Sequence, residues 1–138
     1  MRVISVLTAS AALASCTAGP YMAPTRTAEN QRQYEMLLAG KVAQPPISCL
    51  PHYSSGDMRT IDDNTILFRD GGNRTYVAHM QADCSGLANG HYALVTHQFG
   101  TADLCRGDIA QLVDTTARIQ VGSCVFGDFT PYVRPGRS

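Results

Sequence analysis

TILFRDGGNRTYVAHM, residues 65–80, is the stretch of sequence that decides the fold of this chain. Its two ends, Thr65–Arg69 and Thr75–Met80, are rich in β-branched and aromatic residues, which favour strands. The tetrad Asp70–Asn73 between them contains two adjacent glycines and is typical of a tight turn. The sequence therefore predicts a β-hairpin at this point.

Further strands are predicted on both sides of this hairpin. Three are clear, and they span His91–His97, Ile109–Val113 and Arg118–Phe126. Two shorter ones are expected near Ile47–Leu50 and Met58–Ile61. Apolar residues occur at both odd and even positions of these runs, which indicates strands that are covered on both faces or curled on themselves. We therefore expect a mainly β fold, a small antiparallel β-barrel or sandwich over residues 45–134.

A short helix is predicted before the β domain, over residues 28–40. Thr27 can cap its first turn, and Gly40 suits its end. Apolar side chains recur at helical spacing at Tyr34, Leu37 and Leu38. This narrow apolar face either binds a partner or packs on the chain's own domain, and we expect the second.

The first 15 residues have the anatomy of an export signal. Arg2 gives a positive start, and the apolar run Val3–Ala14 is shorter than the roughly 20 residues of a membrane span. The run ends in Leu13-Ala14-Ser15-Cys16, which has the pattern of a bacterial lipobox. Cleavage there would leave Cys16 as the first residue, carrying acyl chains that hold the protein on a membrane. The alternative is ordinary secretion with an unmodified Cys16.

The residues after Cys16 indicate how the domain would be held. Thr17 takes the place where an Asp usually marks retention in the inner membrane, so we expect the outer membrane, facing the periplasm. Residues 16–27 contain Ala, Gly, Pro and Thr and predict a flexible tether with a reach near 20 Å. Such a chain would contact the membrane through its lipid and could meet a protein partner of the envelope.

Four of the five cysteines belong to the β domain: Cys49, Cys84, Cys105 and Cys124. In an oxidising compartment an even set of this kind most often forms two disulfides, and three connectivities are open. Our expected pairing is Cys49–Cys124 and Cys84–Cys105. It would tie the first strand of the domain to the last and close an internal loop.

Several blocks of this domain resemble a family of small exported bacterial proteins that is classed only as a domain of unknown function. The most specific is the Arg-x-Ile-Asp-Asp-x-Thr-Ile-Leu-Phe block at residues 59–68. The others are Cys49, Tyr76, Cys84–Leu87, Leu104–Ile109 and Gly122–Phe129, in which Phe126 replaces an expected Leu. The resemblance covers about residues 47–130. It implies four domain cysteines, an exported location and no established activity.

The composition of the chain excludes some functions. The chain has 11 Lys and Arg residues against 11 Asp and Glu residues, with no basic stripe, so we expect no nucleic-acid partner. Trp is absent, which argues against a carbohydrate-stacking platform. No cofactor is predicted. We expect a lipid-anchored envelope protein whose domain is a non-enzymatic binding or structural module.

Two metal-binding hypotheses compete with this interpretation. Asp62 and Asp63 could supply oxygen ligands to Ca²⁺, but the simpler interpretation is that an aspartate caps the turn before the next strand. A zinc site could draw on a second set of residues, Cys49, His52, His79 and Cys84. This set lacks paired Cys-x-x-Cys spacing, and we expect its cysteines to form disulfides.

A small periplasmic enzyme is the other competing class. His91 or His97 could act with a nearby carboxylate such as Asp103, and Ser85 or Ser123 could serve as the nucleophile. No Gly-x-Ser-x-Gly elbow is present, so this hypothesis depends on the fold bringing these residues together. We therefore lean away from an enzyme.

Overall fold

The computed structural model describes residues 26–51, 57–82, 84–97 and 103–136. The expected export signal, Cys16, most of the tether and His52 lie outside the described residues. The elements in chain order are helix α1 (Ala28–Leu38), β1 (Val42–Ala43), β2 (Cys49–Leu50), β3 (Met58–Thr60), β4 (Thr65–Asp70), β5 (Arg74–Met80), the 3₁₀ helix η2 (Leu87–Asn89), β6 (Tyr92–Thr96), β7 (Leu104–Cys105), β8 (Ile109–Asp114) and β9 (Gln120–Val133).

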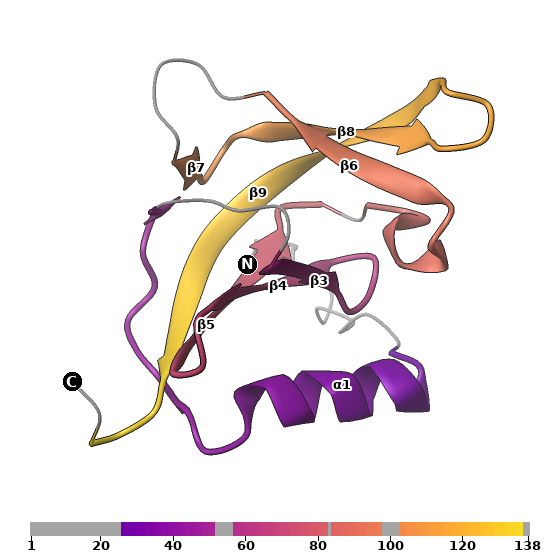
Figure 1. The fold of residues 1–138 in the computed structure, drawn as a ribbon. Helices are drawn as coiled ribbons and strands as arrows, with labels where there is room; N and C mark the ends of the chain where they lie inside the picture. Colours follow the sequence, from indigo (N-terminus) through magenta and orange to yellow (C-terminus); the bar gives the residue numbers. More distant parts are fainter. Residues whose placement is uncertain (1–25, 52–56, 83, 98–102, 137–138) are drawn as a thin grey trace, which may run out of the picture.

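The strands form one curled antiparallel sheet and a small ribbon. The sheet has the strand order β3-β4-β5-β9-β8-β6, and β1 also pairs with β9. Strands β2 and β7 pair separately. The mainly β prediction is therefore confirmed, in the form of a half-barrel with one N-terminal helix (Figure 1). The domain has two disulfides.

Strand β9 is the element shared by the two halves of the sheet. Its first part pairs with β8, from Val113↔Gln120 to Ile109↔Val125, and its second part pairs with β5. Figure 1 shows this yellow strand running from the half of the sheet that contains β6 and β8 to the half that contains β3, β4 and β5. The sequence predicted only residues 118–126 of it. Gly127 and Pro131 interrupt the strand pattern beyond that point, and neighbouring strands keep the chain extended there.

Alternate strand residues pack into the main core. Phe68, Phe126 and Phe129 lie at its centre, with ring centroids 6.0–6.3 Å apart. Tyr76 and Ala78 of β5 join them, because they are two residues apart and share a face of the sheet. This main core contains residues from both halves of the sheet, so the halves form one hydrophobic unit.

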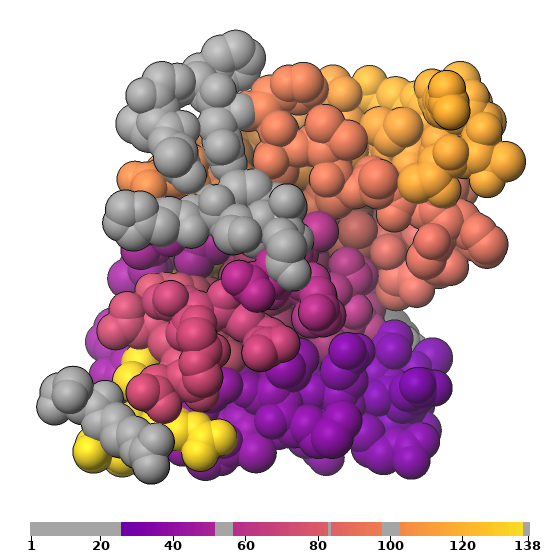
Figure 2. Space-filling model, in the orientation of Figure 1, coloured from indigo at the N-terminus to yellow at the C-terminus, as the bar shows by residue number. Residues whose placement is uncertain are grey.

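Helix α1 packs on the opposite face of β4, β5 and β9. Its Tyr34, Leu37 and Leu38 lie against the smaller cluster of Ile61, Leu67 and Val77, so the expectation that this face packs on the chain's own domain is confirmed. Thr27 Oγ1 accepts a hydrogen bond from the Asn30 amide at 3.1 Å, which is the predicted cap. Gly40 has a φ of +70° just after the helix. Figure 2 shows the indigo surface of α1 against the magenta surface of the hairpin.

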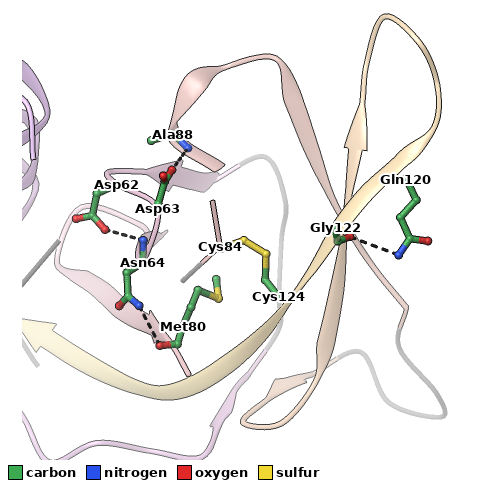
Figure 3. Close-up of a disulfide and its surroundings, with 9 residues drawn as sticks. All are labelled: Asp62, Asp63, Asn64, Met80, Cys84, Ala88, Gln120, Gly122 and Cys124. Carbon is green, nitrogen blue, oxygen red and sulfur yellow. Dashed lines mark hydrogen bonds between the residues drawn. A yellow bond between two sulfur atoms is a disulfide. The ribbon is translucent and has the colours of Figure 1, made fainter. Parts of the chain in front are cut away.

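The two disulfides join Cys49 to Cys105 and Cys84 to Cys124, so the pairing expected from the sequence was wrong. Ile47 pairs with Phe129, and continuing that register would bring Cys49 opposite residue 127. That point lies about 10 Å along the strand from Cys124, beyond the span of a disulfide. Cys49 is instead the register partner of Cys105 in the ribbon of β2 and β7. Cys84 and Cys124 are buried in the main core (Figure 3).

Strand β9 contains one close backbone approach that only glycine permits. Between Ala78↔Phe129 and Met80↔Phe126, two steps along β5 match three along β9, which is a β-bulge. Gly127 lies in this bulge, and a Cβ added there would overlap the carbonyl oxygen of His79. A side chain at this position would therefore push β5 and β9 apart.

We predict that Gly127→Ala lowers the free energy of unfolding by about 2–3 kcal/mol, because backbone must move to accept the methyl group. Gly122→Ala is the matched control in the same strand. A Cβ at Gly122 has Leu112 Cβ as its nearest neighbour at 4.0 Å, so the free energy should stay within about 0.5 kcal/mol of wild type. Urea unfolding of both variants measures the difference. Equal losses in the two would contradict the role of the bulge.

We predict that trypsin digestion of the unreduced protein yields one species in which disulfides join three peptides. Cleavage after Arg74 and Arg106 leaves Cys84 and Cys105 on one peptide. The two disulfides of the structure join this peptide to the peptide that contains Cys49 and to the peptide that contains Cys124. The pairing Cys49–Cys124 with Cys84–Cys105 would leave that peptide separate. A second protease that cleaves before Asp103 should separate the peptide of Cys105, still bound to the peptide of Cys49, from the peptide of Cys84. Mass spectrometry that finds Cys49 bound to Cys124 or Cys84 would overturn the connectivity.

Candidate functional site

An apolar groove of about 660 Å³ lies at the end of the sheet where β1, β5 and β9 meet. Its apolar residues are Val42, Pro45, Ile47, Tyr76, Pro131, Val133 and Pro135, and its polar ones are Gln44, Arg74 and Arg134. Cavities of roughly 300–1,000 Å³ with mainly apolar walls and a few placed polar groups are typical of small-molecule sites. This groove is therefore the candidate binding site.

The pleat of the sheet explains why these side chains meet. Arg74 pairs with Val133 and Tyr76 pairs with Pro131, and paired residues share a face in an antiparallel sheet. The next pair on the same face, Ala78 with Phe129, belongs to the main core. The groove is therefore the open end of the core layer. Helix α1 packs on the other face and does not line it.

Hydrogen bonds hold the segment from Gln44 to Ile47 along β9. The Gln44 amide donates to the Pro131 carbonyl at 2.7 Å. Ile47 and Phe129 exchange two amide–carbonyl bonds, at 2.8 and 2.9 Å. Since prolines have no N–H, Pro45 and Pro131 add no backbone donors to the groove. The wall is therefore preformed, and its backbone groups are largely used or missing.

Two arginines are among the residues that line the groove. Arg74 donates from Nη1 to the hydroxyl of Tyr76 at 3.3 Å and lies 3.7 Å from an Asp70 carboxylate oxygen. The Arg74 and Asp70 side chains are both about half exposed, so this ion pair contributes at most about 1 kcal/mol. Arg134 follows Val133 in the chain, and its amide donates to the Asn73 carbonyl. Within the described residues, the Arg134 side chain has no ion pair or hydrogen bond.

More positive charge lies close to this end of the sheet. Lys41 Nζ donates to the Leu37 carbonyl at 2.6 Å and to Thr75 Oγ1 at 2.7 Å. Burial lowers the pKa of Lys41, and the nearby charges of Arg134 and Arg69 lower it further. These contacts connect five ionisable side chains, which are four cations and one carboxylate: Lys41, Arg69, Arg74, Arg134 and Asp70. This end of the sheet therefore carries an excess of positive charge, with Arg74 on the groove face and Lys41 and Arg69 on the face of α1.

The side chains of Asp62 and Asp63 point in different directions, and each accepts a hydrogen bond from a different part of the chain (Figure 3). Asp62 accepts the Asn64 amide at 2.8 Å on Oδ1 and Arg26 Nε at 2.6 Å on Oδ2. Asp63 Oδ1 accepts the Ala88 amide at 2.9 Å. The turn-capping interpretation is confirmed by these bonds. Within the described ranges, no group of three or more His, Cys, Asp or Glu side chains could hold a metal ion.

The sequence did not indicate the role of Arg26. Its guanidinium pairs with Asp62, donates to Thr65 Oγ1 at 3.2 Å and lies 4.1 Å above the ring of Tyr34. These contacts fix the start of α1 on the hairpin, with a charge-assisted bond and a cation–π contact. The only local signal was a basic residue directly before the helix cap.

The residues of the hydrolase hypothesis are not assembled. His91 and His97 lie before and after β6, about 20 Å apart along an extended chain, and both are exposed. Ser85 and Ser123 line a pocket of about 250 Å³ beside the Cys84–Cys124 disulfide, and neither histidine lines it. Asp103 is half-buried at the start of β7.

For the zinc hypothesis, both Cys49 and Cys84 are consumed as disulfides. Of its two histidines, His52 lies outside the described residues, and His79 contacts Thr65. The thiolates that a Cys-and-His zinc site needs are therefore not available in the oxidised chain.

Comparisons of the chain with protein-family models, with curated proteins and with solved structures give no match. Within the described residues, no helix combines the length and the apolarity needed to cross a bilayer. The groove was not predicted from the sequence, because its residues come from three segments, 42–47, 74–76 and 131–135. Each segment alone looks like an ordinary strand end, and the prolines at 45, 131 and 135 were the only unusual signal.

We predict that the free energy of unfolding falls as the pH drops below about 6.5, because of His79. Its Nδ1 lies 3.4 Å from Thr65 Oγ1. Burial lowers the pKa of His79 from its usual 6.5, the Arg26 charge lowers it further, and the Asp62 charge opposes both. At a pH between the lowered pKa of His79 in the folded chain and its usual pKa of 6.5 in the unfolded chain, the unfolded chain binds more protons. Acid therefore favours unfolding, and the contribution of the neutral His79 ring to the free energy of unfolding is fully present only above pH 6.5.

The variant His79→Gln should reduce this pH dependence. Urea unfolding between pH 5 and pH 8 measures it, and NMR titration of the ring gives the pKa directly. His97→Gln is the control, since His97 follows β6, which lies at the opposite edge of the sheet from β4 and β5. A wild-type pH slope in His79→Gln would show that another group carries the effect.

Proposed function

We propose that this chain is a bacterial envelope protein that is anchored by lipid on Cys16 and presents its β domain to the periplasm as a non-enzymatic binding module. The lipobox pattern at Leu13–Cys16 and the tether composition of residues 16–27 support the anchor. Thr17 favours the outer membrane. The resemblance to a family of exported proteins agrees with this location.

The preformed groove is the observation that carries the binding role. It is apolar, lies at an end of the sheet that carries an excess of positive charge, and belongs to a domain that two disulfides cross-link. Closing loops of 56 and 40 residues, each disulfide contributes about 4 kcal/mol in the chain-entropy account. A rigid site of this kind can bind a ligand without paying for its own ordering.

The geometry of α1 supports the same proposal. Arg26 fixes the start of the helix on Asp62, and the expected tether precedes this point in the sequence. The other end of the helix leads into β1, whose Val42 lines the groove. An 11-residue helix is about 16 Å long. A tether that joins the chain at the start of α1 would therefore attach at the end of the helix that does not lead into the groove.

We predict that a photo-crosslinking amino acid at Val42 captures a ligand in cells. Val42 lines the groove and is 52% exposed, so the replacement should not disturb packing. Met36 on the outer face of α1, 71% exposed, is the matched control position. Adducts should form at Val42 and be absent at Met36. Equal adducts at both positions would contradict a binding role for the groove.

The same cells test the anchor. The wild-type chain should incorporate a labelled fatty acid and fractionate with the membrane, and Cys16→Ser should do neither. Adduct formation at Val42 should fall in Cys16→Ser if the ligand belongs to the envelope. Membrane retention of Cys16→Ser at the wild-type level would overturn the lipid anchor.

A further inference from the structure

We propose that the groove binds a single-chain fatty carboxylate, with its alkyl chain along the apolar wall and its carboxylate on Arg74 and Arg134. This inference rests on the proposed function and names the ligand class of the same site. It follows from three features of the groove: its apolar wall, its shortage of free backbone N–H donors and the excess of positive charge at this end of the sheet.

The wall of the groove suits an alkyl chain. Val42, Pro45, Ile47 and Val133 present only carbon to its interior. Its uncharged polar side-chain groups are the Gln44 amide and the Tyr76 hydroxyl, and the hydroxyl already accepts from Arg74. A methylene group gains about 0.8 kcal/mol on full burial against such a surface. The volume of about 660 Å³ falls in the range of drug-sized ligands, so one chain suits it better than a two-chain lipid.

The same wall is a poor site for an extended peptide. Peptides that add to a sheet bind through free N–H and C=O groups. Here the Gln44 amide already bonds Pro131, and Ile47 and Phe129 already bond each other in both directions. Pro45, Pro131 and Pro135 have no N–H to offer. An alkyl chain needs no such partner, so the backbone chemistry favours it.

The guanidinium groups supply the selectivity for an anion. Arg74 is the register partner of Val133, and Arg134 follows Val133 directly after the end of β9, so the two arginines start from neighbouring points of the backbone. A guanidinium matches the two oxygens of a carboxylate in geometry as well as charge. Arg134 makes no ion pair with a described residue, and the exposed Asp70 is a weak partner for Arg74. Both can therefore turn to a ligand.

The surrounding charges strengthen this preference. The charges of Arg134 and Arg69 both act on Lys41, and Asp70 is the only carboxylate among these contacts. A cationic amphiphile with the same alkyl chain would therefore be repelled from the mouth of the groove. This contrast separates binding by charge from binding by hydrophobicity alone.

The test is isothermal titration of the full chain carrying Cys16→Ser, which has no lipid of its own, with dodecanoate below its micelle concentration. We expect one dodecanoate per chain, at least tenfold weaker binding of dodecyltrimethylammonium and no measurable binding of acetate. Equal affinity for the cationic amphiphile would overturn the proposal. At least tenfold tighter binding of dodecyl phosphate, or of phosphatidylglycerol vesicles, would overturn it in favour of a phosphate-bearing lipid.

Variants locate the site. The double variant Arg74→Gln, Arg134→Gln should weaken dodecanoate at least tenfold, because it removes the charge-assisted bonds. Val42→Asp should weaken it similarly by placing a carboxylate in the wall, and Val42 is exposed enough for the fold to tolerate the change. Arg59→Gln, on the exposed side of β3, is the matched control and should bind like the parent chain.

Wild-type affinity in both groove variants would overturn the site. A failure of the fatty-carboxylate proposal can be distinguished from a failure of the proposed binding function. If Val42 crosslinks to a polypeptide in cells while dodecanoate does not bind, the binding module stands and the fatty carboxylate is wrong. Thermal unfolding of each variant establishes that a loss of binding is not a loss of fold.

Discussion

The close backbone approach at Gly127 is the constraint on which the rest of the structure depends. Strand β9 must pair with β8 in its first part and with β5 in its second. It carries an extra residue both opposite Leu112/Val113 and opposite Ala78/Met80, and bulges of this kind bend and twist a strand. At the second bulge, the missing Cβ of Gly127 lets β9 lie against the His79 carbonyl. One bent strand can then serve both halves of the sheet.

The groove is a consequence of this arrangement. Beyond the second bulge, β9 continues to Val133 with β5 on one side and β1 on the other. Its side chains alternate between the face covered by α1 and the face of the main core. At Val133 the core face is open, and Arg74 and Arg134 border it. A strand that ended at residue 126, as the sequence pattern indicated, would leave no such site.

Sequence patterns predicted the local elements because those depend on residues close together in the chain. The hairpin from Thr65 to Met80 needs only two strand-forming runs and a turn. The cap at Thr27 needs only a hydroxyl three residues before a free amide, and the structure shows that bond. The turn at Asp62 is of the same kind. The second part of β9 was missed, because Pro131 is tolerated there only through partners that are far away in sequence.

The sequence by itself determined the mainly β class, the docking face of α1 and an even set of four domain cysteines. Each follows from side-chain periodicity or from residue counts. The tertiary structure alone decided that Cys49 pairs with Cys105, which follows from the strand register between β2 and β7. It alone decided that Arg74 and Arg134 share one groove. Contacts between residues 56 or 60 positions apart depend on the path of the whole chain, and no local pattern encodes that path.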